Sequence, residues 1–312
     1  MKSNNILEIT HLVKNYQDTK DEIKAIDDFS YNVSEGKFIS IVGPSGCGKS
    51  TLLSILANLE DKSSGIIKFN KDNIILGYML QKDSLFPWLT ILDNCLLGLE
   101  IKNIKTEDNI SYVNHLLDSY GLAEFKSKYP SSLSGGMRQR IVIAIALSCD
   151  PYVLICDEPT TALDVTIQAK ILELIQDIQK KKDLSVIYIT HDLGVVAKVA
   201  DYVNVMYAGK IVETGTIDEI FYDPRHPYTW GLLSSMPDLD TDDDELYTIP
   251  GTPPNLAHEV KGDAFAPRNK YALNIDLRIE PPMFKVPGST THKVASWLMH
   301  EKAPKVEMPV EL

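Results

Sequence analysis

The chain has 312 residues, of which 44% are hydrophobic and 24% are charged, and this predicts a globular protein with one large domain and a smaller domain or extension. The formal net charge of −12 argues against nucleic acid as the main partner, because binding a phosphate backbone needs a concentration of Lys and Arg. Four cysteines without a C-x-x-C pairing, an N-terminus without a signal segment, and apolar runs shorter than the roughly 20 residues of a membrane span predict a cytosolic protein with reduced thiols.

Short strands are predicted for the first 43 residues, because β-branched and aromatic residues mix there with polar ones between turn formers. The segments are ILEITHLVKNY at 6–16, IDDFSYNV at 26–33 and KFISIVG at 37–43. The last is nearly all apolar, which is typical of a strand buried on both faces. It leads into GPSGCGKST at 43–51 and then into a predicted helix, LLSILANL at 52–59.

A helical pattern runs from Gln81 to about residue 150, and its clearest segments are SYVNHLLDSYGLAEF and QRIVIAIALSC. Buried strands and a helix then alternate as VLICDE, AKILELIQDIQK and LSVIYIT, followed by a strand pair, VNVMYAGKIVETG, that turns at Ala208-Gly209. This alternation predicts a mainly parallel α/β sheet interrupted by a helical insertion.

The composition changes after about residue 235. The acidic run DLDTDDDEL at 238–246 is followed by IPGTPPN and EPPMFKVPG, which form a Pro- and Gly-rich stretch with little periodicity. The sequence therefore predicts a C-terminal extension rather than a second α/β domain.

The segment GPSGCGKST fits the pattern G-x-x-x-x-G-K-[ST] and lies between a predicted buried strand and a helix. In that setting the backbone N–H groups of the loop and of the helix N-terminus face a polyphosphate, and glycines permit a close approach. Lys49 is expected to reach the β- and γ-phosphates, and the hydroxyl of Ser50 is expected to ligate Mg²⁺. The alternative is a Gly-rich loop that fits the pattern by chance.

The strand VLICDE carries two acids, Asp157 and Glu158, to its carboxyl end, where open α/β sheets bind their ligands. Asp157 is expected to hold Mg²⁺ in its outer shell, and Glu158 to orient and polarise the attacking water. The alternative for these acids is a solvated strand end.

A second helix start able to receive an anion is predicted at LSGGMRQR, residues 133–140, where a Ser and two glycines open a helix. Taken alone, this motif could be a simple N-cap followed by flexible glycines.

These motifs, in their order and spacing, resemble the nucleotide-binding subunit of an ATP-binding-cassette transporter over residues 5 to about 235. The motifs that carry the resemblance are GPSGCGKST, Gln81, LSGGMRQR, VLICDEP, the loop TTALD ending at Asp164, and THD with His191. The resemblance implies an α/β fold: a P-loop NTPase core of mainly parallel sheet, an N-terminal antiparallel β-subdomain, a helical subdomain at about 82–150, and a Pro/Gly-rich C-terminal extension. It divides the chain into a cassette domain at 1–235 and an extension at 236–312.

In this family two subunits pack head to tail, so that each ATP lies between the phosphate loop of one and the LSGG of the other. The resemblance implies that Tyr16 stacks on adenine, although a tyrosine packed at a sheet edge is the alternative. It further implies that Gln81 senses Mg²⁺ and the γ-phosphate, that His191 contacts the γ-phosphate, and that Asp164 communicates across the dimer.

Three sets of site residues follow from the motifs and the resemblance. The residues expected at ATP are Tyr16, Gly43, Pro44, Ser45, Gly46, Cys47, Gly48, Lys49, Ser50, Thr51, Ser134, Gly135, Gly136 and Asp164. Those expected to act in catalysis are Lys49, Gln81, Glu158 and His191, and those expected at Mg²⁺ are Ser50, Gln81 and Asp157. Cys47 is either a small filler or a modifiable thiol whose alkylation inhibits hydrolysis unless ATP protects it.

The run Phe86-Pro87-Trp88 follows Gln81, where the family forms a groove that receives a helix of the membrane subunit. We expect it to line this docking surface; the alternative is ordinary core packing. The segment QKDSLFPWLTILDN resembles importers of sulfonates and nitrate, whereas the chain from LSGGMRQR onward resembles oligopeptide importer ATPases. The two parts resemble different transporters, and the sequence leaves open whether this mosaic of two importer classes is natural or an artificial recombinant.

The tail IPGTPPNLAHEVKGDAFAPRNKYALNID resembles the extension of oligopeptide and dipeptide importer ATPases, some of which place cysteines there for an iron–sulfur cluster. The matching positions are Asp263, Asn269 and Asp276, so no cluster is expected, because thiolate ligands are missing. A packing and dimer-contact role is the preferred interpretation of the tail.

The function predicted from these resemblances is the ATP-hydrolysing subunit of an importer, with oligopeptides as the favoured solute. The expected partners are integral membrane permease subunits, a second ATPase subunit of the same or another kind, and, indirectly, an extracellular solute-binding protein. The expected location is the cytoplasmic face of the membrane. The alternatives are a sulfonate- or nitrate-type importer ATPase, a soluble cassette ATPase of translation or DNA repair, and a catalytically weak regulatory module.

Overall fold

The computed structural model describes residues 4–17, 22–81, 83–160, 163–236, 248–257 and 260–306. The acidic run at 238–246 lies outside the described residues. The chain divides into two compact units, a first of Met1–Ile6, Val33–Phe38 and Phe69–Tyr188 and a second of Leu7–Asn32, Ile39–Lys68 and Ile189–Leu312.

The sheet of the second unit contains the strand that leads into the phosphate loop. This strand, β3 (Phe38–Val42), runs parallel to β8 (Tyr202–Tyr207), and β9 (Lys210–Thr216) returns antiparallel to β8. The turn between β8 and β9 lies at Ala208 and Gly209, with φ values of 51° and 82°, so the predicted strand pair is confirmed.

The C-terminal extension joins this sheet. Its strand β11 (Lys293–Val294) pairs antiparallel with β9, and β10 (Phe284–Lys285) pairs with β11. Both strands were missed in the sequence, because two residues are too few to show an alternating pattern.

A three-stranded sheet, largely in the second unit, has the order β2 (Glu22–Ser34), β1 (Asn5–Gln17), β4 (Ser64–Phe69). The first two strands agree with the prediction. The helices of the second unit are α1 (Lys49–Leu56), α6 (Leu193–Val199), α7 (Ile217–Tyr222) and α8 (Pro227–Ser234).

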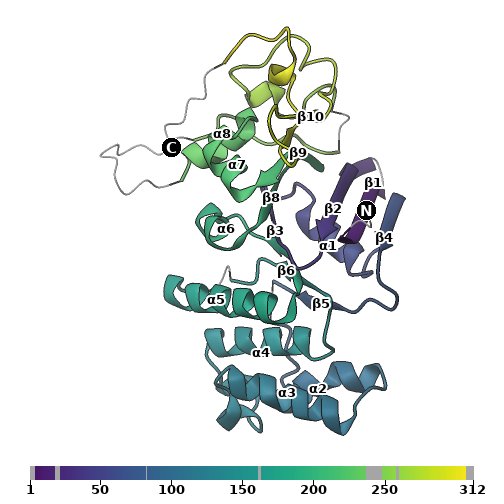
Figure 1. Ribbon diagram of the computed structural model, residues 1–312, viewed down its shortest axis with the longest axis vertical. Coiled ribbons are helices and arrows are strands. Elements are labelled where there is room, and N and C mark those ends of the chain that lie inside the picture. Colours follow the sequence, from purple (N-terminus) through teal and green to yellow (C-terminus); the bar gives the residue numbers. More distant parts are fainter. Residues whose placement is uncertain are drawn as a thin grey trace. The chain divides into compact units, whose positions relative to one another are not determined.

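The first unit holds β7 (Ser185–Ile189), β6 (Val153–Asp157) and β5 (Leu76–Met79) as neighbours in that order, with β5 and β6 parallel. Its helices are α2 (Ile91–Ile101), α3 (Glu107–Ser119), α4 (Gly135–Leu147) and α5 (Val165–Lys182), which lie side by side in Figure 1. The helical insertion therefore forms where it was predicted. Strand β5 was not predicted, because its four residues, LGYM, are too few to show a pattern.

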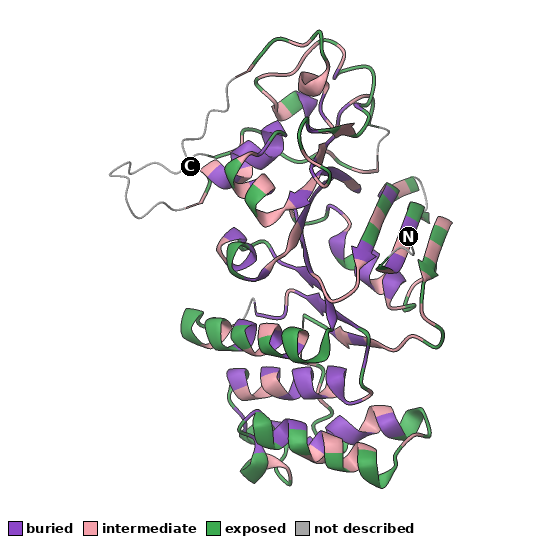
Figure 2. Ribbon diagram, viewed as in Figure 1, coloured by how far each residue is buried: buried purple, intermediate pink, exposed green. Residues whose placement is uncertain are grey.

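The core of the second unit extends from β3 into the extension. Val42 and the β8 residues Val203, Val205 and Tyr207 belong to one buried cluster with Phe265 of the extension. Figure 2 shows β3 and β8 as mostly buried, whereas β4 has no buried residue. The extension therefore shares a core with the strand that carries the phosphate loop.

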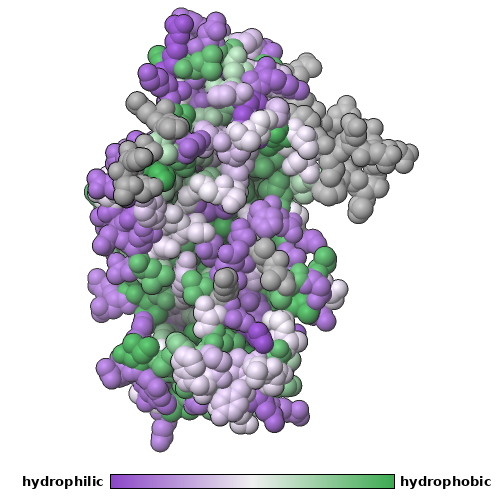
Figure 3. All heavy atoms as spheres, turned by 180° about the vertical axis from the view of Figure 1, so that it is seen from behind, coloured by the Kyte–Doolittle hydropathy of each residue, from purple (hydrophilic) through white to green (hydrophobic). Residues whose placement is uncertain are grey.

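Among the described helices, none combines the length and the apolar character that crossing a membrane requires. Hydrophilic and hydrophobic residues are interspersed over the face drawn in Figure 3.

Candidate nucleotide site

The phosphate loop lies between β3 and α1 in the second unit. Gly48 caps α1 with a φ of 100°, and a Cβ at this position would lie 2.2 Å from the carbonyl oxygen of Ala25. A Cβ on Gly43 would lie 2.3 Å from the carbonyl oxygen of Met206. Both positions therefore require glycine, because the loop packs directly against neighbouring backbone.

Lys49 is the first residue of α1, and its side chain folds back over the loop. Its Nζ donates to the carbonyl oxygens of Gly43 at 2.8 Å and Pro44 at 2.9 Å, and only 7% of the residue is exposed. The N-terminus of α1 has no side-chain cap. The ammonium and the helix N-terminus thus occur together in one loop, which is an arrangement suited to a polyphosphate.

Tyr16 lies near the end of β1 and is 37% exposed. Burial and a hydrogen bond with Glu60 raise the pKa of the Tyr16 hydroxyl. A hydrogen bond with Thr51 of α1 lowers this pKa, but the net direction is upward. Lys14 Nζ lies 4.8 Å from the ring centroid. The structure therefore brings Tyr16 to the helix that follows the phosphate loop.

His191 is exposed and follows Thr190, which is the first residue after β7. Its neighbour Asp192 caps α6 by accepting a hydrogen bond from the N–H of Val195 at 3.2 Å. In the described structure His191 lies in the second unit, together with the phosphate loop.

Cys47 is buried in the loop, with 3% of the residue exposed, and burial raises the pKa of its thiol. A thiolate is the reactive form, so this environment opposes the modification considered from the sequence and favours the role of a small filler. We expect a thiol reagent to label Cys47 in the folded chain more slowly than the half-buried Cys149, measured by mass spectrometry of peptides. Faster labelling at Cys47 than at Cys149 would contradict this.

In the first unit, Gln81 and Glu158 lie together. Gln81 follows the end of β5 by two residues and Glu158 follows β6 directly, and these strands are parallel. Nε2 of Gln81 lies 3.5 Å from Oε2 of Glu158, at the outer limit of a hydrogen bond. Gln81, predicted at Mg²⁺ and the γ-phosphate, and Glu158, predicted to act on the attacking water, are thus adjacent.

Asp157 ends β6 and is 8% exposed. Glu158 has a φ of 45°, a conformation that is uncommon for residues other than glycine. Such backbone strain persists only where the surrounding structure enforces it, and it clusters at functional sites.

The residues predicted from LSGG and TTALD stand at helix starts, also in the first unit. Ser134 caps α4 and accepts a hydrogen bond from Met137, and Asp164 caps α5 and accepts one from Ile167 at 3.0 Å. Gly135 is exposed, whereas Gly136 is buried, and a Cβ there would lie 2.7 Å from Ile167. The glycine pair thus lets α4 and α5 pack closely at their starts, in addition to any role toward an anion.

An ion pair that the sequence did not indicate joins this helix to the segment after Gln81. Nη1 of Arg138 on α4 lies 3.5 Å from Oδ2 of Asp83. Arg138 stands within the quoted motif, but its partner is 55 positions away, so only the fold reveals the pair.

Phe86 and Trp88 are exposed by 41% and 70%, and their ring centroids lie 5.4 Å apart. The buried side chain of Asn94 on α2 holds this turn: it accepts from the N–H of Phe86 at 2.9 Å and donates to the carbonyl oxygens of Phe86, Leu89 and Thr90. The exposed rings exclude simple core packing of Trp88. Asn94 was missed in the sequence, because an asparagine inside a helix gives no sign of such bonds.

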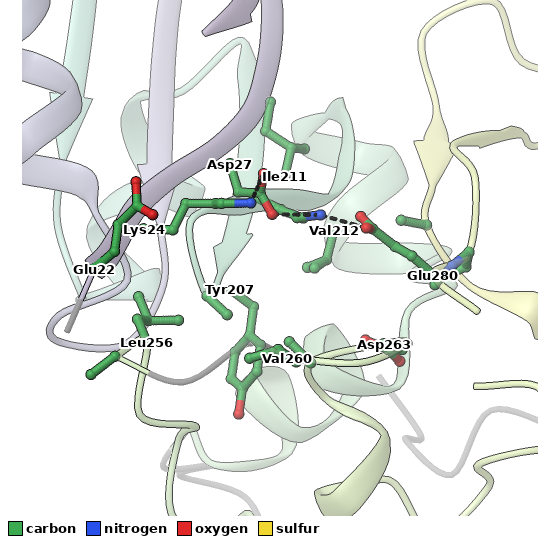
Figure 4. Close-up of a pocket in the computed structure, with 17 residues that line it drawn as sticks. Glu22, Lys24, Asp27, Tyr207, Ile211, Val212, Leu256, Val260, Asp263 and Glu280 are labelled. Carbon is green, nitrogen blue, oxygen red and sulfur yellow. Dashed lines mark hydrogen bonds and ion pairs between the residues drawn. The ribbon is translucent and has the colours of Figure 1, made fainter. Parts of the chain in front are cut away.

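A cavity of about 600 Å³ lies in the second unit between β2, β8, β9 and the extension (Figure 4). Nζ of Lys210 forms ion pairs with Oδ2 of Asp27, at 2.9 Å, and with the carboxylate of Glu280. Nζ of Lys24 lies 3.3 Å from Oδ1 of Asp27. Burial raises the pKa of Asp263, in the same wall, to about 6. Both cations of the described wall are paired with carboxylates, so this cavity is not arranged to receive phosphates.

The three positions matched to cluster cysteines have structural partners. One side-chain oxygen of each of Asp263, Asn269 and Asp276 accepts a hydrogen bond from a backbone N–H two or three residues away, at 2.9, 2.9 and 2.6 Å respectively. These residues therefore fix local turns within the extension.

Comparison with known families agrees with the geometry of both parts. A model of the ABC transporter family matches residues 26–161, and a model of the oligopeptide/dipeptide transporter C-terminal region matches residues 212–275. The dimeric structure of MJ0796, a bacterial ABC transporter cassette, superposes with a TM-score of 0.61 and 29% identity over 68% of this chain and 98% of that one. A structure of the same cassette bound to ADP and Pi has the same TM-score at 28% identity.

Relatives extend over nearly the whole chain. The oligopeptide transport ATP-binding protein OppD of Bacillus subtilis is 46% identical over 334 residues, covering 97% of this chain and 92% of that protein. The dipeptide transport ATP-binding protein DppD of Lactococcus lactis is 43% identical, covering 98% and 94%. This chain therefore belongs to the oligopeptide and dipeptide transport ATP-binding proteins of the ABC transporter family.

Proposed function

We propose that this chain hydrolyses ATP to energise a membrane importer of oligopeptides or dipeptides. The observation that carries the proposal is that Gln81 and Glu158 lie within hydrogen-bond distance at the ends of β5 and β6. The same chain has a phosphate loop over which the side chain of Lys49 folds back. Phosphoryl transfer depends mainly on positioning and charge neutralisation, and these groups supply both. The similarity of the whole chain to peptide transport proteins supports the choice of solute.

Each group of site residues is proposed to have its own role in binding or hydrolysing ATP. Lys49 and the backbone of residues 43–51 bind the phosphates, Tyr16 contacts the base, and Glu158 orients and polarises the attacking water. His191 would help to keep that water aligned. Mg²⁺, when bound, would neutralise phosphate charge; Ser50, Gln81 and Asp157 offer the hydroxyl, amide and carboxylate oxygens that this ion prefers.

Catalysis is proposed to need a second ATPase subunit, identical or not, whose Ser134, Gly135 and Gly136 face the phosphates held by this chain. Asp164 would act between the two. The dimeric cassette with the same fold supports this arrangement. The pair would sit on permease subunits at the cytoplasmic face of a membrane and serve an extracellular solute-binding protein only indirectly.

An iron–sulfur cluster is not part of the proposal. The oxygen donors of Asp263, Asn269 and Asp276 do not suit iron–sulfur ligation, and the four cysteines of the sequence all precede the extension.

The nucleotide site is tested by ATP binding and hydrolysis of the purified chain and of its Lys49→Ala variant. Loss of the buried ammonium removes charge-assisted bonds to the phosphates, so nucleotide affinity should fall about 10- to 100-fold. The matched control is Lys62→Ala, which removes an exposed lysine of the same unit. Equal affinity in the unaltered chain and the Lys49 variant would refute the site.

Trp88 tests the proposed permease contact. Since Trp88 is 70% exposed, Trp88→Ala should leave the unfolding temperature unchanged within about 2 °C. The same variant should lose most permease-stimulated hydrolysis, because exposed aromatic residues supply much of the energy of such contacts. Ile101→Ala, which is also exposed, is the control. Full stimulation of the Trp88 variant in an intact complex would remove the docking role.

A further inference from the structure

A segment of the extension lies beside the phosphate loop. Residues 249–256, IPGTPPNL, are here called the strap. A cavity of about 260 Å³ is lined on one side by Pro253, Pro254, Asn255 and Leu256 of the strap and on the other by loop residues 44–47, together with Ile23 and Ala208. All of these residues belong to the second unit. The strap thus faces the half of the loop that precedes α1.

One side chain fastens the start of the strap. Arg268 donates from Nε to the carbonyl oxygen of Pro250 at 2.7 Å and from Nη2 to that of Ile249 at 3.2 Å. Its Nη1 donates to the hydroxyl of Tyr207 at 3.1 Å. The planar fork of arginine makes these three bonds at once, which a lysine cannot do.

The far end of this link is the buried end of β8. Tyr207 is 1% exposed, and its ring lies 4.7 Å from that of Tyr228 and 5.3 Å from that of Phe265. Figure 4 shows Tyr207 and Leu256 on the wall of the larger cavity, so the strap borders both cavities. Arg268 therefore fastens the strap to a side chain that packing holds in place.

The turn that follows Tyr207 contacts the phosphate loop directly. The N–H of Gly209 donates to the carbonyl oxygen of Cys47 at 3.0 Å, and the carbonyl oxygen of Gly209 accepts from the N–H of Asp27 at 3.0 Å. A continuous set of bonds thus runs from the strap through Arg268 and β8 to Cys47. The loop is thus bonded to this turn, and loop residues 44–47 line the same cavity as the strap.

A loop that must order itself when phosphates bind loses affinity by the cost of that ordering. Two adjacent prolines in the strap limit its own conformations, so that a fastened strap is a stiff neighbour for residues 44–47. We propose that Arg268 is a positioning residue for the nucleotide site: it holds the strap beside the phosphate loop and thereby raises the loop's affinity for nucleotide. This inference rests on the proposed nucleotide site.

The test is nucleotide affinity of the full chain, measured with a fluorescent ATP analogue, together with KM and kcat for ATP. Arg268→Ala should weaken binding and raise KM about fivefold, while kcat at saturating ATP changes less than twofold. Arg268→Lys, which keeps the charge but offers one donor nitrogen in place of three, should recover part of the affinity. Arg278→Ala, an exposed arginine of the same extension, is the control and should match the unaltered chain.

Hydrogen exchange separates positioning from general stability. Amides of residues 44–47 should exchange faster in Arg268→Ala than in Arg278→Ala, in the absence of nucleotide. A variant with a lower unfolding temperature but unaltered nucleotide affinity would show that Arg268 only stabilises the fold, and would overturn the proposal.

A second variant covers the case in which Arg268→Ala does not fold. Pro253→Gly with Pro254→Gly loosens the strap without removing a buried side chain, and it should weaken nucleotide binding to a similar extent. If the chain binds nucleotide in a Lys49-dependent way and this variant has unchanged nucleotide affinity, the role of the strap is overturned and the nucleotide site is not. Absence of Lys49-dependent binding in the unaltered chain would instead refute the nucleotide site and the strap's role with it.

Discussion

Replacing Glu158 by Gln should reduce ATP hydrolysis by at least about a hundredfold while ATP remains bound. A general base contributes roughly 10²- to 10⁴-fold, and an amide keeps the shape of the side chain but cannot accept the proton of water. Gln81, at 3.5 Å, can hydrogen-bond an amide as well as a carboxylate, so the turn after β6 should stay in place.

The measurement is the steady-state release of phosphate, with ATP binding followed in parallel. Glu173→Gln removes an exposed carboxylate on α5 of the same unit and should hydrolyse ATP at the unaltered rate. Hydrolysis by Glu158→Gln within twofold of the unaltered chain would show that another group activates the water.

The largest expected effect on stability comes from Glu213, a fully buried carboxylate on β9. It accepts hydrogen bonds from the N–H groups of Arg225 at 2.6 Å and His226 at 3.1 Å, and it lies 2.8 Å from Nε2 of His292. Glu213→Ala leaves these groups buried without their acceptor. Removing one partner of a buried ion pair lowers the free energy of unfolding by about 3–5 kcal/mol.

Thermal unfolding measures this cost. We expect Glu213→Ala to lower the unfolding temperature by about 10 °C, given the usual relation between free energy and midpoint for chains above 150 residues. Glu301→Ala, at an exposed acid of the extension, should leave the midpoint unchanged. A shift below about 2 °C for Glu213→Ala would mean that water or nearby groups replace the carboxylate.

The positions of the phosphate-loop glycines, of Lys49 and of the two strand-end acids in the fold were predictable, because they depend on neighbours in the chain. Residues 43–48 lie between β3 and α1 and residues 49–51 begin α1, as the pattern requires, and Glu158 directly follows β6. Predicting that Gln81 and Glu158 lie side by side would have required one further piece of knowledge. Strand β5 had to be known to run parallel to β6, and its four residues carry too little pattern to reveal that.

Other features depend on contacts between distant residues, and no local pattern announces them. The fork of Arg268 joins carbonyl groups 18 and 19 positions earlier to a hydroxyl 61 positions earlier. Cys47 looked reactive in the sequence because it stands in a Gly-rich loop, but the folded chain buries it, and its carbonyl oxygen is bonded to the turn after β8. Burial is a property of the assembled core, so it could not be derived from the loop alone.

The two resemblances found along the chain have different support. The peptide transport relatives align over 94–98% of this chain. The alignment with OppD of Bacillus subtilis spans 334 residues, which is longer than the chain itself, so that protein has insertions relative to this one.

The central claim is tested most directly by reconstituting this chain in liposomes with the permease subunits and second ATPase of a peptide importer, and measuring ATP-dependent peptide uptake. Uptake that disappears with Glu158→Gln and persists with Glu173→Gln is the result predicted here. A parallel assembly with a sulfonate-type permease should show neither uptake nor stimulated hydrolysis. Stimulation by the sulfonate-type permease alone would contradict the peptide assignment.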